Sequence, residues 1–127
     1  MKRRVLVIED NEQNRYLVTF LLERHGFEVR SEAEGPRGIE CARSWNPDLI
    51  LLDIQLPMMD GYDVARALRA VDTLGNTPIV AVTSYAMAGD REKSLAAGCT
   101  GYIEKPINPD TFVAELEDIV GRGGRDG

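Results

Sequence analysis

Short apolar runs rich in valine, isoleucine and leucine recur along the chain, separated by segments whose apolar residues follow the period of a helix. Runs of four to eight apolar residues without polar alternation are typical of strands that are buried on both faces of a parallel sheet. They predict strands at 4–9, 49–52, 79–82 and 101–104. Residues 27–31 alternate between apolar and polar positions, which predicts a strand at the edge of the sheet.

The intervening segments predict five helices, each preceded by one strand. They are expected to begin at Glu12, Gly35, Gly61, Asp90 and Pro109. Asn108 is a favourable N-cap for the last helix, since its side chain can accept a backbone hydrogen bond, and proline is favoured at the first helical position. The third helix is expected to carry Val71 on its apolar face.

Five strand–helix units in succession predict an α/β fold with a parallel sheet between two helical layers. The length of 127 residues suits one domain, which we assign to 1–121, followed by a glycine- and arginine-rich tail at 122–127 that we expect to be flexible. Sheets of this kind bind ligands beyond the carboxyl ends of their strands, so these ends are where chemistry is expected.

The overall charge narrows the range of functions. Lys and Arg number 15 against 21 Asp and Glu, for a net charge of −6 and a pI of about 4.8. This acidity disfavours nucleic acid and anionic membranes as partners, because both require cations on the protein.

No apolar run is long enough to span a membrane or form a signal peptide, so we expect a cytoplasmic protein. Cys41 and Cys99 lack metal-ligand spacing and are expected to be packing residues.

Polar residues end four of the five predicted strands: Glu9 and Asp10, Asp53, Thr83, and Lys105. Parallel strands bring their carboxyl ends to one edge of the sheet, so these side chains are expected to converge. Three carboxylates in one crevice repel each other and require a cation. Oxygen ligands with access to water suit Mg²⁺.

This set of residues suits phosphoryl transfer, which needs a metal ion, a fixed cation and an in-line nucleophile. Asp53 is the expected nucleophile, because it ends the most apolar strand, and a carboxylate can accept the phosphoryl group as an aspartyl-phosphate. Asp10, with Glu9 behind it, is expected to hold the metal. A backbone carbonyl just after Asp53, such as that of Gln55, could be a further ligand.

Four sequence stretches carry a resemblance to a known family. They are VLVIEDN at 5–11, DLILLDIQLPMMDG at 48–61, VAVTS at 80–84 and YIEKP at 102–106. In their order and spacing they resemble the CheY-like receiver domains of two-component response regulators, and in particular single-domain regulators of the DivK kind. The resemblance covers residues 4 to about 120. It implies a doubly wound, flavodoxin-like sheet of five parallel strands in the order 2-1-3-4-5.

The resemblance also assigns roles to individual residues. It makes Asp53 the phosphoryl acceptor, and it implies Mg²⁺ or Mn²⁺ bound by Asp10, Asp53 and the backbone carbonyl of Gln55, with Glu9 acting through water. Thr83 and Lys105 would contact the phosphoryl group. Further positions that match the family are Tyr102, an aromatic that swings inward; Pro106, after a cis bond; and Pro57 and Gly61, as structural residues. Two positions are less typical of the family, Ser84, where alanine is common, and the bulky Tyr85, and both lie near the phosphoryl group's water access.

The implied function is a switch that is not itself a turnover enzyme. A histidine kinase or histidine phosphotransfer protein would donate the phosphoryl group, and the surface of the fourth helix, fifth strand and fifth helix would then change for an unidentified downstream protein. The protein is expected to be a monomer or a weak, phosphorylation-linked dimer.

Other functions remain open at this stage. A flavin- or nucleotide-binding protein would need a phosphate loop after the first strand, where Glu9 and Asp10 would repel phosphate. A metal-dependent phosphatase would normally need a carboxylate at the position of Gln55. The chain could also be the receiver fragment of a hybrid kinase or larger regulator, or a receiver that no longer needs phosphate.

Overall fold

The computed structural model describes residues 2–84 and 89–125. Five strands and five α-helices alternate along these residues, with one short 3₁₀ helix, Asp72–Leu74. The strands are β1 (Arg4–Ile8), β2 (Glu28–Glu32), β3 (Leu49–Asp53), β4 (Ile79–Thr83) and β5 (Gly101–Glu104). The helices are α1 (Glu12–Arg24), α2 (Gly35–Trp45), α3 (Gly61–Arg69), α4 (Asp90–Ala96) and α5 (Phe112–Arg125).

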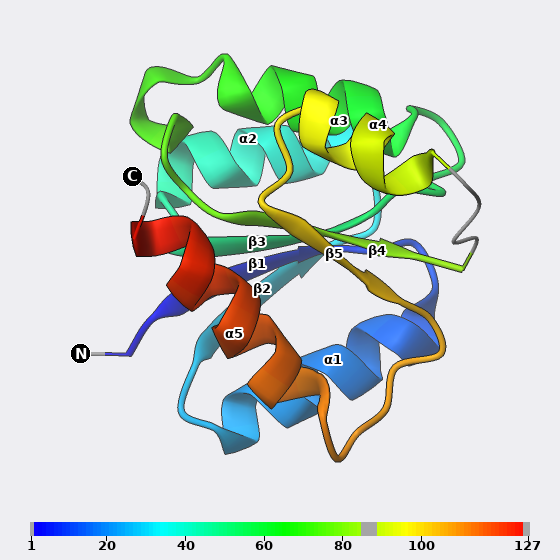
Figure 1. Cartoon of the computed structure of the whole chain (residues 1–127), viewed down its shortest axis with the longest axis vertical. Coiled ribbons are helices and arrows are strands. Elements are labelled where there is room, and N and C mark those ends of the chain that lie inside the picture. The colour runs from blue at the N-terminus through cyan, green and yellow to red at the C-terminus, as the bar shows by residue number, and fades with distance from the viewer. Residues whose placement is uncertain (1, 85–88, 126–127) are drawn as a thin grey trace.

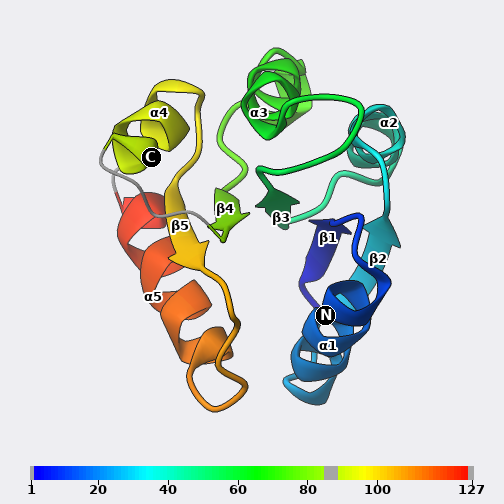
Figure 2. The same cartoon turned by 90° about the vertical axis from the view of Figure 1, so that its right-hand side faces the viewer.

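The strands form one parallel sheet in the order β2-β1-β3-β4-β5, which confirms the predicted fold. Helices α1 and α5 cover one face of the sheet, and α2, α3 and α4 cover the other (Figure 1). Figure 2 looks onto the carboxyl ends of the strands and shows the sheet between the two helical layers. β3 lies at the centre, between β1 and β4, so its carboxyl end lies in the middle of this edge.

Alternate residues of the central strands supply two separate hydrophobic cores. In β1, Val5 and Val7 pack in the core beneath α1 and α5, whereas Leu6 and Ile8 pack in the core beneath α2 and α3. All four side chains are buried, and β3 and β4 show the same pattern. The absence of polar alternation in these runs therefore has a simple cause, since both faces of each strand are covered by helices.

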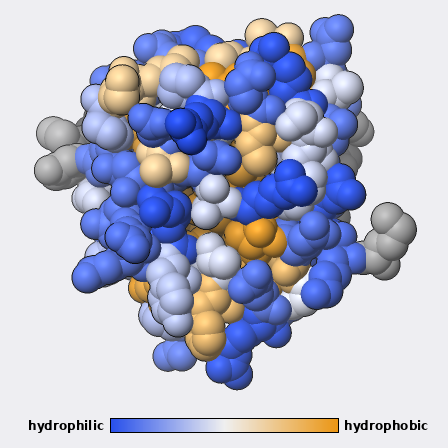
Figure 3. Space-filling view, turned by 180° about the vertical axis from the view of Figure 1, so that it is seen from behind, coloured by the Kyte–Doolittle hydropathy of each residue, from blue (hydrophilic) through white to orange (hydrophobic). Residues whose placement is uncertain are grey.

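β2 is an edge strand, as its alternating pattern predicts. None of its residues is fully buried, and Glu28, Arg30 and Ser31 are exposed. Seen from behind, the molecular surface is largely hydrophilic, and its hydrophobic areas are small and separate (Figure 3). No helix among the described residues is long and apolar enough to cross a membrane.

The prediction that Val71 lies on the third helix is wrong. α3 ends at Arg69, and Val71 is extended and precedes the 3₁₀ helix. The Arg69 side chain explains the early end, because its guanidinium donates hydrogen bonds to the carbonyls of Leu74 and Thr77 and folds the following segment back beneath it. A helical continuation would have left these carbonyls out of its reach.

The last helix begins later than predicted, although its predicted cap is present in part. The Asn108 side chain accepts a hydrogen bond from the N–H of Asp110 at 2.9 Å, and its carbonyl accepts one from the N–H of Phe112 at 2.9 Å. Asn108 therefore satisfies backbone donors as a cap does. Residues 109–111, however, form a turn, and α5 begins at Phe112, not at Pro109. α5 reaches Arg125, within the segment predicted to be a tail, so flexibility at 122–127 stays a prediction.

Gly61 is required by a close approach of two backbones. A Cβ atom there would lie 2.4 Å from Cα of Ile54, the residue after Asp53, and could not be accommodated by side-chain movement. We expect Gly61→Ala to lower the free energy of unfolding by about 1–3 kcal/mol, in the range of overpacking mutations. Urea unfolding followed by circular dichroism measures this.

Gly75→Ala is the matched control. Its added Cβ would meet only a carbonyl oxygen at 3.7 Å, and its φ of −59° suits alanine. The control should unfold like the wild type or gain about 0.5 kcal/mol from reduced freedom of the unfolded chain. Equal losses in both variants would show that the contact with Ile54 is not the cause.

Candidate functional site

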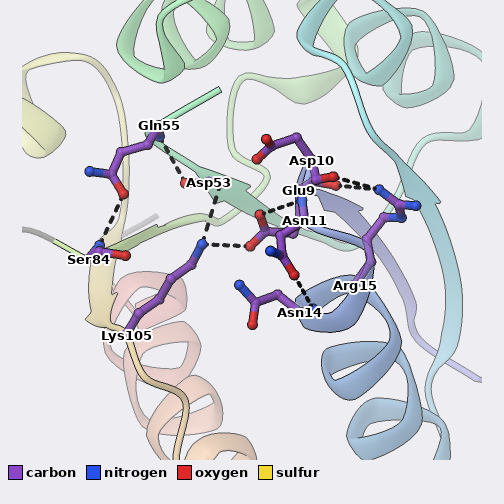
Figure 4. Close-up of polar contacts among 9 residues, drawn as sticks. All are labelled: Glu9, Asp10, Asn11, Asn14, Arg15, Asp53, Gln55, Ser84 and Lys105. Atoms are coloured by element: carbon purple, nitrogen blue, oxygen red, sulfur yellow. Dashed lines mark hydrogen bonds and ion pairs between the residues drawn. The ribbon is translucent and has the colours of Figure 1, made fainter. Parts of the chain in front are cut away.

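Three of the predicted site residues converge at the carboxyl edge of the sheet. Glu9 follows β1, Asp53 ends β3, and Lys105 follows β5. All three continue the set of alternate strand residues that faces α1 and α5. Figure 4 shows the Lys105 ammonium between the carboxyl groups of Glu9 and Asp53.

Asp53 is held from two sides. Its carboxylate accepts a hydrogen bond from the backbone N–H of Gln55 at 2.8 Å through Oδ1, and Oδ2 lies 3.4 Å from the Lys105 Nζ atom. The residue is 3% exposed. The buried end of β3 therefore presents one carboxyl group in a fixed orientation.

Glu9 is the second buried carboxyl group. Its Oε1 atom lies 2.8 Å from the Lys105 Nζ atom, and Oε2 accepts a hydrogen bond from the N–H of Asn11 at 3.2 Å. Burial raises the pKa of Glu9 above its ordinary value, and the neighbouring Asp53 raises it further, while the Lys105 ammonium and the Asn11 N–H lower it in part. Burial and crowding with Asp53 therefore favour the protonated form of Glu9, despite the nearby ammonium group.

Lys105 is the cation between the two carboxylates. Burial lowers its pKa, but its hydrogen bond to Glu9 and the charge of Asp53 together raise the pKa by more, so that it lies above its ordinary value. The ammonium group is therefore charged at neutral pH. The peptide bond between Lys105 and Pro106 is cis.

Asp10 completes an acidic cluster. One carboxylate oxygen from each of Glu9, Asp10 and Asp53 lies within 4.8 Å of the others, and Asp10 is the exposed member. Hard oxygen donors that face water on one side fit a Mg²⁺ ion, which keeps several of its water ligands. The donor set of this crevice therefore suits the predicted metal, and a bound divalent cation would relieve the mutual repulsion of the carboxylates.

Thr83 and Tyr102 lie on the opposite set of alternate strand residues from Asp53. Thr83 is 6% exposed and ends β4, and Tyr102 in β5 packs against the core beneath α2 and α3. Beside Thr83, the exposed Ser84 donates its N–H to the Gln55 side chain at 3.4 Å (Figure 4). Inward movement of Tyr102 stays a prediction, as does the metal-ligand role of the Gln55 carbonyl.

Pro57 is exposed in the loop between β3 and α3, and Gly61 is buried where that loop returns to Ile54. Tyr85 lies outside the described residues.

Sequence reasoning missed Asn11 and Arg15. Asn11 caps α1 through the N–H of Asn14, a role that its position before the helical pattern could have predicted.

Comparisons with known proteins agree with one another over most of the chain. Residues 5–117 match the model of the response regulator receiver domain. The polar-differentiation response regulator DivK of Brucella anthropi is 40% identical over 121 residues, which is 95% of this chain and 98% of DivK. DivK of Brucella ovis is 39% identical over the same coverage.

Solved structures agree with this similarity. The chemotaxis response regulator CheY4 of Vibrio cholerae superposes with a TM-score of 0.89 at 28% identity, over 94% of this chain and 99% of that one. The receiver domain of the sensor histidine kinase PA1611 from Pseudomonas aeruginosa PAO1 gives a TM-score of 0.86 at 33% identity, over 95% of this chain and 99% of that one. That structure has a magnesium ion coordinated in its active site cleft.

Removing one carboxylate of the acidic cluster should change stability and metal binding in opposite directions. We expect Asp10→Asn to raise the free energy of unfolding of the metal-free protein by about 0.5 kcal/mol, because one of three repelling charges is removed at an exposed position. The same change should weaken Mg²⁺ binding at least tenfold, because it removes a charged ligand. Urea unfolding with and without Mg²⁺ measures both effects.

Glu23→Gln, an exposed position on α1 away from the cluster, controls for the loss of one negative charge. It should leave the Mg²⁺ dependence of unfolding unchanged. If Mg²⁺ stabilised Asp10→Asn as strongly as the wild type, Asp10 would not be a ligand of the ion.

Proposed function

The chain belongs to the response regulator receiver domain family of two-component systems, and from this premise we propose that Asp53 is its phosphoryl acceptor. Phosphorylation of an aspartate at a Mg²⁺ site is general for that family. One observation carries the assignment to Asp53: its carboxyl group is buried beside the Lys105 ammonium and within reach of the acidic residues Glu9 and Asp10.

The proposed reaction transfers a phosphoryl group from a phosphohistidine of a kinase or phosphotransfer protein. A carboxylate oxygen of Asp53 attacks phosphorus, forming an O–P bond, while the P–N bond breaks and its electron pair returns to the histidine nitrogen. The residues proposed to hold Mg²⁺ are Asp10, Asp53 and the backbone carbonyl of Gln55, with Glu9 contributing through water. Bound there, the ion supplies charge neutralisation on the phosphoryl oxygens.

Lys105 and Thr83 are proposed to receive the phosphoryl group. The ammonium of Lys105 already contacts Asp53 and would pair with a phosphoryl oxygen attached to it. Thr83, at the end of the neighbouring strand β4, would donate its hydroxyl hydrogen to a second oxygen. Ser84 follows it and lies beside the same crevice.

The output is proposed to be a change at the surface formed by α4, β5 and α5. A groove of about 680 Å³ lies there, and Arg91, Leu95, Tyr102, Glu104 and Asp118 are among its lining residues. Movement of Thr83 toward the phosphoryl group would free space beneath Tyr102, which lines this groove, and so change what a partner protein contacts. A partner that prefers the changed surface then stabilises the phosphorylated state.

We further propose that the protein is a switch, not an enzyme with turnover on other substrates. Gln55, an amide, stands two residues after Asp53, so this position offers no carboxyl group to act as the acid and base of a phosphatase.

The free cysteines of the protein, Cys41 and Cys99, support a cytoplasmic location. The kinase and the downstream protein are not identified by any of these residues.

The acceptor is tested by intact mass after incubation with acetyl phosphate and Mg²⁺. We expect one phosphoryl adduct on the wild type, none without Mg²⁺, and none on Asp53→Asn. The asparagine variant keeps the size of the side chain and can still accept the hydrogen bond from Gln55, so it should fold. An adduct that persists on Asp53→Asn would assign the acceptor to another residue.

Lys105→Ala tests the switch apart from metal binding. Without the ammonium group the phosphoryl group loses its cation, so we expect Mg²⁺ still to bind but the amide chemical shifts of α4 and β5 to change little on addition of beryllofluoride. Arg43→Ala, an exposed position on α2 outside the proposed output surface, is the control and should respond like the wild type. Wild-type shift changes in Lys105→Ala would contradict this role.

A further inference from the structure

Arg15 contacts the loop that carries the acidic pair. Its Nη1 atom donates hydrogen bonds to the backbone carbonyl of Glu9 at 3.0 Å and to that of Asp10 at 3.3 Å. Arg15 lies in α1, just after the helix begins at Glu12, and its side chain is half-buried. Figure 4 shows the guanidinium reaching back across the start of the helix to both carbonyls.

The three carboxyl groups of the cluster are not equally restrained. Asp53 is held by the Gln55 N–H and by Lys105, and Glu9 is held by the Asn11 N–H and by Lys105. The Asp10 carboxylate has no hydrogen bond or ion pair within the described residues. Its direction is therefore set by its backbone, and Arg15 holds the carbonyls on both sides of the Asp10 Cα atom.

The position of Arg15 is otherwise unfavourable. A cation near the amino end of a helix opposes the helix dipole. A positive charge near a metal site also opposes binding of a cation. An arginine at this position needs a compensating contact, and the two backbone carbonyls provide it.

We infer that Arg15 is a positioning residue for the metal site: it fixes the two peptide groups around Asp10 so that the Asp10 carboxylate points toward Asp53 before the ion binds. The inference rests on the proposed function, because it assumes that Mg²⁺ binds at Glu9, Asp10 and Asp53. It assigns Arg15 no contact with the ion or with the phosphoryl group.

Geometry and charge predict opposite results when Arg15 is replaced. If Arg15 acted only through its charge, Arg15→Gln would strengthen Mg²⁺ binding, because a repelling cation is removed. If Arg15 positions Asp10, the same variant loses the preorganised ligand and binds Mg²⁺ more weakly. The loss expected from one to two hydrogen bonds is about fivefold to tenfold in the dissociation constant.

Calorimetric titration of Mg²⁺ into the protein tests this, with Arg15→Gln, Arg15→Lys and the control Arg24→Gln. Arg24 lies at the other end of α1, so its replacement removes the same charge far from the loop and should leave the affinity within about twofold. Arg15→Lys keeps the charge, but its shorter side chain brings the ammonium group less fully to the two carbonyls, so its affinity should fall between those of Arg15→Gln and the wild type.

A second measurement uses the metal-free protein. Amide hydrogen exchange at Asp10 and Asn11 should be faster in Arg15→Gln than in the wild type, and unchanged in Arg24→Gln. Tighter or equal Mg²⁺ binding by Arg15→Gln would overturn the inference, as would unchanged exchange at these amides. Failure of the wild type to bind Mg²⁺ would instead overturn the proposed function.

Discussion

The mutual repulsion of carboxyl groups at one edge of the sheet is the constraint on which the site depends. Glu9 and Asp53 are buried there with one ammonium group, that of Lys105, between them. Burial makes every charge more costly, and the fold meets that cost with hydrogen bonds from the backbone N–H groups of Asn11 and Gln55. Together with Asp10, these carboxyl groups form an acidic cluster whose oxygen donors fit a divalent cation, and such an ion would relieve their repulsion.

The pleat of the strands places the acidic residues and the pair Thr83 and Tyr102 on opposite sides of the sheet. Alternate residues of a strand face opposite sides, so Glu9, Asp53 and Lys105 share the side of α1 and α5, whereas Thr83 and Tyr102 share the side of α2, α3 and α4. In the proposed switch, a phosphoryl group on Asp53 would act on α4 through a residue at the end of a neighbouring strand. Thr83 occupies that position, next to Asp53 along the edge of the sheet and on the same set of residues as Tyr102.

Much of this was predictable because two sequence signals are strong. Apolar runs such as that of β3 specify buried parallel strands, and a polar residue at the end of each run specifies where side chains meet. Arg69 and Arg15 show what such signals leave out. Each acts through its guanidinium on backbone carbonyls, and a carbonyl is present at every residue, so no pattern of side chains marks the contact. The early end of α3 and the anchoring of the Asp10 loop were missed for this common reason.

The exposed edge of β2 bears on how the protein behaves at high concentration. An edge strand offers unpaired backbone groups to any extended segment that approaches, and long apolar edges are sites of aggregation. Here Glu28, Arg30 and Glu32 alternate in charge along the strand, and the approaching chain would have to accommodate all three. Growth of the sheet by addition of strands from other molecules is disfavoured on this side, even though the interior strands are among the most hydrophobic segments of the chain.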